Sequence, residues 1–155
     1  MPKIVVESVP ERKGSGYPAP FHLASGERVR RALGKAGGLT HFGVNLLHLA
    51  PGAWSSQRHW HSREDEFVWV LEGEVVLITG AGEEILRAGE CAAFPADAPD
   101  GHHIANRSEA PAICLEVGTD SPDDVCTYPD IDMRVDNRDG VYRHMDGTPY
   151  PQRER

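Results

Sequence analysis

The sequence predicts an antiparallel, all-β fold, on three observations. Between residues 39 and 119, short runs rich in Val, Ile, Leu, Phe and Trp alternate with turn signals at intervals of about ten residues. No segment in that range has the 3.6-residue period of an amphipathic helix. Glu72-Gly73 and Gly80-Ala81-Gly82 are the short, glycine-containing links that join paired strands. Together these features favour a β-sandwich or a β-barrel.

The expected elements divide the chain into three parts. Residues 1–38, rich in Gly, Pro and charge from residue 11 onward, predict an N-terminal arm with one short helix over Ser25–Leu33, capped by Ser25. Residues 120–155, Asp-rich and interrupted by proline, predict a C-terminal extension that packs on the barrel through its tyrosines. The barrel itself, residues 39–119, contains the expected strands, which are Thr40–Leu49, Trp54–His61, Glu66–Leu71, Glu74–Thr79, Glu83–Arg87, Glu90–Pro95, His102–Asn106 and Ala112–Val117.

Length and composition limit the possible partners and compartment. A chain of 155 residues with 39% hydrophobic residues is long enough for one domain with its own core. Its formal net charge of −8 argues against nucleic acid and anionic membranes as partners. Three cysteines without Cys-x-x-Cys spacing favour a reducing compartment, with Cys91 and Cys114 as small core residues. No signal peptide or membrane-spanning run is evident, so a cytoplasmic location is expected.

Histidine is the unusual component, with eight in the chain. Residues two apart on a strand face the same way, so His59 and His61 should project from one face. Glu66 opens a strand whose same-face residues are valines, and we therefore expect its carboxylate to face the barrel interior with them. On a later strand His102 shares a face with Ile104. Imidazoles and a carboxylate that converge in this way would bind one divalent transition metal, Fe, Mn, Zn, Ni or Cu.

Other polar residues near this cluster have weaker support. Gln57 shares the predicted histidine face and could approach the open position of the metal. His48 alternates with apolar neighbours and could line the pocket or the far sheet. These two are the pocket candidates, and no catalytic acid or base is evident from the sequence. Arg58 and Arg63 are expected to be surface charges, because nothing in their spacing ties them to the cluster.

Two motifs in this region resemble those of the cupin superfamily. The first contains Gly52, six residues, His59-Trp60-His61, four residues, Glu66, six residues and Gly73. The second contains Gly89, five residues, Pro95-Ala96-Asp97, an expanded loop, His102, three residues and Asn106. The matching region runs from about Thr40 to Val117.

This resemblance implies a single jelly-roll barrel and a metal held by His59, His61, Glu66 and His102. The rebuilt loop before the last ligand leaves His103 as an alternative to His102, although the spacing to Asn106 favours His102. Asp65 is an alternative to Glu66, but its distance to Gly73 and its strand parity are both wrong. The resemblance and the open sheet edges also favour a homodimer.

Two classes of function are compatible with these residues. The first, which we prefer, is a metal-dependent enzyme that acts on a small oxygen-bearing molecule, a carboxylate, carbonyl or sugar-like compound, as a dioxygenase or an isomerase. The second is a non-catalytic metal-containing cupin that binds or senses a small molecule. A general acid or base beside the metal would discriminate between them.

Overall fold

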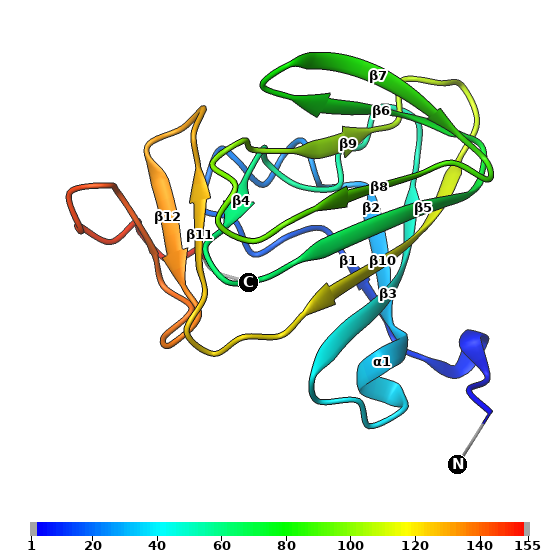
Figure 1. Cartoon of the computed structure of the whole chain (residues 1–155), viewed down its shortest axis with the longest axis horizontal. Helices are drawn as coiled ribbons and strands as arrows, with labels where there is room; N and C mark the ends of the chain where they lie inside the picture. Colours follow the sequence, from blue (N-terminus) through cyan, green and yellow to red (C-terminus); the bar gives the residue numbers. More distant parts are fainter. Residues whose placement is uncertain (1–2, 154–155) are drawn as a thin grey trace.

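The runs of β-branched and aromatic residues form strands, which the computed structural model, describing residues 3–153, arranges in three antiparallel sheets (Figure 1). The six-stranded sheet has the order β1-β2-β3-β10-β5-β8 and the three-stranded sheet the order β7-β6-β9. The all-β prediction is confirmed. The strands of these two sheets are β1 (Glu11–Lys13), β2 (Arg28–Ala32), β3 (Phe42–Leu49), β5 (Glu66–Glu72), β6 (Glu74–Thr79), β7 (Gly82–Arg87), β8 (Cys91–Phe94), β9 (His103–Ala105) and β10 (Ala112–Thr119).

The apolar core lies between these two sheets. Inward-facing side chains come from β3, β5 and β10 on one side and from β6, β7 and β9 on the other. Each fully buried aliphatic side chain contributes about 1.5–3 kcal/mol by leaving water. The larger members of the core are Leu47, Leu49, Val68, Val70, Val75, Leu77, Leu86, Ile104 and Cys114.

Gly73 is the turn residue that joins β5 to β6, as the sequence predicts. Its φ of 76° lies in the left-handed region that favours glycine. A Cβ at this position would also lie 2.8 Å from the carbonyl oxygen of Pro111. Both the turn and the close approach of the backbone therefore require glycine here.

The predicted helix over Ser25–Leu33 is wrong. Residues Arg28–Ala32 form β2, which pairs with both β1 and β3, and the α-helix α1 is confined to Leu33–Ala36. A 3-10 turn, Val6–Ser8, precedes β1. Pairing on both edges satisfies the backbone of β2 in a sheet, and this tertiary pairing outweighs the local helix signal. The segment expected as an arm thus supplies two strands of the six-stranded sheet, while the three-part division stays a prediction.

The predicted strand Trp54–His61 is also largely wrong, because only Trp60–His61 forms a strand, β4. Trp54 pairs with Ala105 and His59 pairs with His102 in isolated antiparallel bridges. His59 lies five residues after Trp54, whereas their partners, His102 and Ala105, lie only three residues apart. The two extra residues have no place in a regular ladder, so the intervening segment leaves the sheet.

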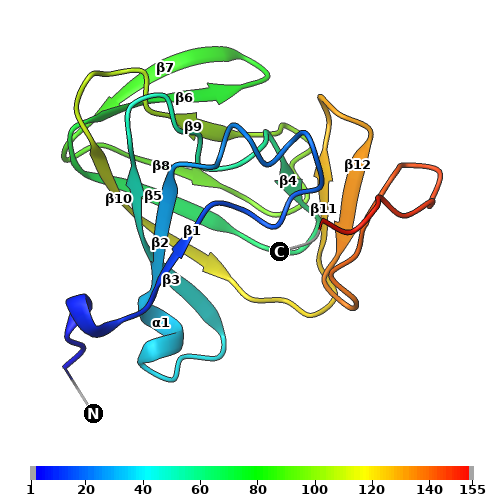
Figure 2. The same ribbon diagram turned by 180° about the vertical axis from the view of Figure 1, so that it is seen from behind.

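The C-terminal segment forms a third sheet at one end of the barrel, with the order β13-β12-β11-β4 (Figures 1 and 2). Its strands are β11 (Val125–Tyr128), β12 (Met133–Asp136) and β13 (Tyr142–Arg143). A second apolar cluster joins this sheet to the N-terminal segment. Its buried members are Tyr17, Cys126, Tyr128 and Met133, with Phe21, Tyr142 and Tyr150 packed against them.

The outer face of the six-stranded sheet carries exposed apolar side chains, among them Phe42, Trp69 and Leu71. The sequence places Cys91 in the core, and this is wrong, because Cys91 is exposed on β8 while Cys114 is buried. The parity of β8 decides this, since Cys91 pairs with the outward-facing Trp69. In residues 3–153 no helix is long and apolar enough to cross a membrane. The homodimer stays a prediction.

Candidate metal centre

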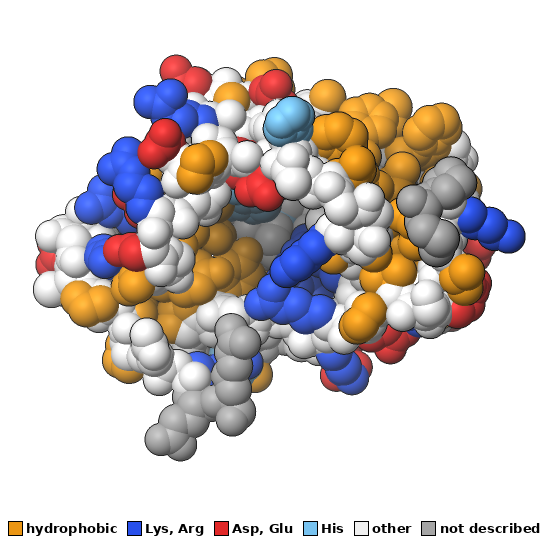
Figure 3. Space-filling view, turned by 90° about the horizontal axis from the view of Figure 1, so that it is seen from below, with side chains coloured by type: hydrophobic (Ala, Val, Ile, Leu, Met, Phe, Trp, Pro, Cys, Tyr) orange, Lys and Arg blue, Asp and Glu red, His pale blue; other side chains and the backbone are white. Residues whose placement is uncertain are grey.

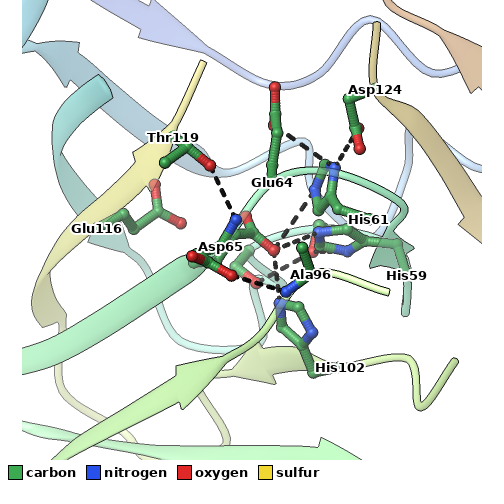
Figure 4. Close-up of polar contacts among 12 residues, drawn as sticks. His59, His61, Glu64, Asp65, Ala96, His102, Glu116, Thr119 and Asp124 are labelled. Atoms are coloured by element: carbon green, nitrogen blue, oxygen red, sulfur yellow. Dashed lines mark hydrogen bonds and ion pairs between the residues drawn. The ribbon is translucent and has the colours of Figure 1, made fainter. Parts of the chain in front are cut away.

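His59, His61 and His102 point toward one another (Figure 4). Their imidazoles converge on one carboxylate oxygen, next to the third sheet, which contains His61 on β4. The Glu66 Oε2 atom lies 2.8 Å from His102 Nε2, 3.2 Å from His59 Nε2 and 3.4 Å from His61 Nε2. Their elements are distant in sequence: Glu66 opens β5, His61 ends β4, and the bridge between His59 and His102 closes the gap to β9. The four residues that the sequence selects are therefore brought together.

Two of these spacings, 3.2 Å and 3.4 Å, are those expected between ligands of one metal ion, and the 2.8 Å spacing to His102 is slightly shorter. Glu66 Oε2 is buried and none of its contacts has hydrogen-bond geometry. Ligand atoms about 2.1 Å from one metal, at tetrahedral or octahedral angles, lie about 3.0–3.4 Å apart. Burial would raise the pKa of Glu66, but the surrounding imidazoles hold that pKa well below its ordinary value. An ionised carboxylate and three imidazole nitrogens form a donor set that suits a divalent transition metal.

Two of the imidazoles are oriented by contacts on their other ring nitrogen. His61 Nδ1 lies 2.6 Å from Oδ2 of Asp124, whose side chain is fully buried. His59 Nδ1 lies 2.9 Å from the carbonyl oxygen of Gln57 and 3.2 Å from Ser56 Oγ. A ring whose Nδ1–H donates to an oxygen keeps the lone pair on Nε2 free for a metal.

His102 and His103 occupy different environments. The His102 ring stacks on Phe94 at 3.5 Å between ring centroids, with its Nε2 facing Glu66. His103 packs against Trp54 at 4.6 Å, and neither of its ring nitrogens has a hydrogen-bond partner within residues 3–153. Burial lowers the pKa of His103 to about 4, so this ring is neutral at pH 7. The geometry therefore favours His102 as the ligand.

The alternative carboxylate, Asp65, is engaged elsewhere. Its Oδ1 accepts a hydrogen bond from the backbone N–H of Ala96 at 2.8 Å, and its own N–H donates to Thr119 Oγ1 at 2.8 Å (Figure 4). Asp65 thus stabilises the chain segments around the site, while the neighbouring Glu66 faces the imidazoles.

The side chains of the two pocket candidates, Gln57 and His48, do not face the four converging residues, although the Gln57 carbonyl contacts His59. Gln57 Nε2 donates to the backbone carbonyl of Phe21 at 2.7 Å, and Gln57 does not line the cavity. The expected shared face with His59 requires a regular strand, which this segment does not form. His48 faces opposite to the buried Leu47 on β3 and does not line the cavity either.

A cavity of about 410 Å³ opens beside the candidate centre, within the size range of small-molecule sites. It is lined by side chains that the sequence did not single out, among them Arg28, Arg30, Glu64 and Glu116. Figure 3 shows the corresponding face, where basic and acidic side chains gather around a hollow. The alternation of Arg28 and Arg30 is the one sequence signal for the two arginines, and it was missed because a helix was predicted for this segment.

Three of these cavity-lining groups, Arg28, Arg30 and Glu64, have shifted pKa values. Burial raises the pKa of Glu64, whose Oε2 lies 3.5 Å from His61 Nδ1. Burial lowers the pKa of Arg30, but the carboxylate of Glu116 more than offsets this, so the net pKa is raised. The cavity thus combines the imidazole cluster with a charged wall.

Comparison with known proteins agrees with this geometry. The family model of the cupin domain matches residues 45–118. A solved structure of a cupin-superfamily sugar phosphate isomerase from Silicibacter pomeroyi is 46% identical, over 97% of each chain, with a TM-score of 0.91. This chain belongs to the cupin superfamily. Together, the family and the grouped His and Glu side chains suggest a metal site whose metal is not identified.

Other solved structures extend the likeness. A proposed sugar phosphate isomerase from Acidithiobacillus ferrooxidans is 32% identical over 77% of this cupin and 76% of that chain, with a TM-score of 0.72. A polyketide cyclase from Streptomyces resistomycificus is 19% identical over 77% of this chain and 79% of that chain, with a TM-score of 0.60, and shares the fold alone. None of the curated proteins matches this chain.

Proposed function

We propose that this cupin is a metal-dependent isomerase of a small, sugar-like hydroxy-carbonyl compound. In this proposal His59, His61, Glu66 and His102 bind one divalent transition metal. The observation that carries it is the convergence of three Nε2 atoms within 3.4 Å of one buried carboxylate oxygen, at the edge of a cavity. A metal bound there would act as a Lewis acid on a carbonyl or hydroxyl oxygen of the substrate.

The cavity wall supplies groups that suit a polyhydroxylated molecule. Asn45 and Asn137 line it with amide groups that both donate and accept hydrogen bonds. Tyr128 also lines it, and burial raises the pKa of Tyr128 well above its ordinary value, so its hydroxyl stays a donor. Val68 and Ile104 form an apolar part of the wall.

The similarity to the Silicibacter pomeroyi protein supports isomerisation in preference to oxygenation. That protein is named as a sugar phosphate isomerase and covers nearly the whole of this chain. Cupin enzymes share one fold across several chemistries, so the choice among them rests on the site and on the similar proteins described above.

The test begins with metal analysis of the purified protein, which should show about one transition-metal ion per chain. The metal-loaded protein is then incubated in D₂O with a panel of aldose and ketose phosphates and the free sugars. Nuclear magnetic resonance should detect product formation with solvent deuterium entering at the carbon next to the carbonyl. A His61→Ala variant should show neither product formation nor deuterium incorporation.

The alternatives give distinct results. Oxygen uptake by the Fe(II) form without isomerisation would replace the isomerase with a dioxygenase. Saturable binding of a sugar phosphate without turnover under any metal would favour the non-catalytic binding protein. Absence of stoichiometric metal after metal reconstitution would overturn the proposal itself.

A further inference from the structure

Strand β2 presents two arginines to the cavity and one to the exterior. Arg28 and Arg30 pair with the inward-facing Leu49 and Leu47 of β3, and both arginines line the cavity. Arg31 is the next residue along the strand after Arg30, so its side chain faces the opposite side of the sheet. On that side its Nη2 lies 2.6 Å from Glu11 Oε1. The strand therefore offers a matched set of three guanidinium groups in different surroundings.

Arg30 is neutralised by a neighbouring carboxylate. Its Nε and Nη2 atoms donate to the two oxygens of Glu116 at 2.7 Å and 2.8 Å, a bidentate pair. Both members of this pair line the cavity wall. The pair adds no net charge to the cavity, and its role is to hold the wall in place.

Arg28 has no such partner. Its residue is only 8% exposed, and its Nε and Nη1 atoms donate to the backbone carbonyls of Gly14 and Ser55. Within residues 3–153, no carboxylate lies close enough to form an ion pair with it. Carbonyl dipoles orient the guanidinium but give it no ion-pair partner, and Glu116, the carboxylate that raises its pKa, is already paired with Arg30. A buried charge without its own partner is unfavourable.

The Arg28 charge persists at physiological pH. Burial, followed by repulsion from Arg30, lowers the pKa of Arg28 to about 10. That value still leaves the side chain protonated at pH 7. The ring of Tyr17, 6.0 Å from Cζ, gives it a cation–π contact but no negative charge.

Short contacts place this cation beside the metal-binding cluster. Arg28 donates to the carbonyl oxygen of Ser55, and the adjacent Ser56 has its Oγ 3.2 Å from His59 Nδ1. The Oγ atoms of the two serines are 3.3 Å apart. One cavity thus has two separate cationic positions, a guanidinium and the proposed metal.

We propose that Arg28 binds the anionic group of the substrate, a phosphate ester or a carboxylate, while the oxygen-bearing end faces the metal-binding cluster. This inference rests on the proposed function for the identity of the second end. Gly14 accepts the single Nε hydrogen of Arg28 and Ser55 accepts one Nη1 hydrogen, so either oxyanion would bind at Nη2 and the second Nη1 hydrogen, donors that lie in one plane. The substrate then spans the cavity between two positive centres and is held in one orientation.

The test uses metal-loaded, full-length protein and two small probes, methyl phosphate and acetate, followed by nuclear magnetic resonance titration. The wild-type protein should bind at least one probe saturably. Arg28→Gln should weaken that binding by about tenfold to a hundredfold, the loss expected for hydrogen bonds to a charged group. Arg28→Lys should lie between, since it keeps the charge but loses the planar fork.

Arg31→Gln is the matched control, because it removes a guanidinium from the same strand on the opposite face, and its affinity for the probe should equal wild type. Metal content and thermal unfolding of each variant check folding. If Arg28→Gln does not fold, a loss of affinity in folded Arg28→Lys carries the same conclusion. Tighter binding of methyl phosphate identifies a phosphate ester, and tighter binding of acetate identifies a carboxylate.

Two results would overturn the inference: no saturable binding of either probe by the wild-type protein, or unchanged affinity in both Arg28 variants. The proposed function fails separately. A protein that turns over no sugar phosphate, yet loses probe binding in Arg28→Gln, would keep the anion subsite and lose the isomerase. A protein that isomerises free sugars and binds neither probe would keep the isomerase and lose the anion subsite.

Discussion

The two ends of the barrel interior are built from the same strands but carry different side chains. On β3 the inward positions change from Leu49 and Leu47 at the closed end to Asn45 at the open end. On β10 they change from Cys114 to Glu116. The closed end is a conventional apolar core, whereas the open end holds the charged wall and the imidazole cluster.

This difference shows that strand periodicity and residue type carry separate information. Alternation with a period of two tells which side chains face inward, and it is the same at both ends. The point at which inward residues stop being apolar marks where the core ends and a cavity begins. Burying polar groups there is unfavourable unless other groups, a metal or a ligand compensate for them.

The largest expected effect is at the open end, where His102→Ala should abolish stoichiometric metal binding. The variant removes the Nε2 atom 2.8 Å from Glu66 Oε2 and leaves an incomplete donor set. Metal analysis after reconstitution measures it. His103→Ala is the control, since this neighbouring ring packs on Trp54, and it should keep the metal. Loss in the control with retention in His102→Ala would reverse the ligand assignment.

At the closed end, Leu49→Ala should lower the free energy of unfolding by about 2–5 kcal/mol. The variant buries less apolar surface and leaves a cavity in the core. The Leu49 side chain is fully buried in the core. Leu71→Ala, on the exposed outer face, should change stability by about 0.5 kcal/mol or less. Urea unfolding measures both. If folded Leu49→Ala also lost its metal, the two ends would not be independent.

A smaller effect is expected from Asp124→Asn, which should weaken metal binding by about tenfold to a hundredfold. The buried carboxylate lies 2.6 Å from His61 Nδ1 and orients that ring, so its loss leaves the ligand present but less well held. Competition with a chelator gives the affinity. Asp123→Asn, at an exposed position beside it, should bind metal like the wild type. Equal losses of metal affinity in the two variants would contradict the idea that Asp124 orients the His61 ring.

The smallest effect concerns the two faces of the sheet at the closed end. At pH 8, iodoacetamide should label Cys91, which is exposed, and leave Cys114 unmodified. Burial raises the pKa of Cys114 to about 12, so its thiol stays protonated until the pH approaches that value. Mass spectrometry of native protein measures this, with Cys91→Ser as control. Rapid labelling of Cys114 would mean that the closed end opens.

Much of the barrel follows from local pattern, and its prediction succeeded where strands are long. The expected run Glu74–Thr79 matches β6, and Glu66–Leu71 differs from β5 by one residue. Prediction failed at Trp54–His61, because the partner strand there is two residues shorter than the segment it faces. It failed at Ser25–Leu33 because pairing with the preceding and following strands, β1 and β3, satisfies that backbone. Local patterns do not contain the length or position of a partner.

The candidate site divides in the same way. The sequence alone determined which fold family to expect and which four side chains to group, because two motifs with definite spacing contain them. Only the tertiary structure placed Asp124 against His61, 63 positions away, and Arg28 at the cavity, whose lining residues come from strands spread along the chain. Motif spacing is a property of one segment, whereas the charges that orient a ligand come from segments that only the fold brings together.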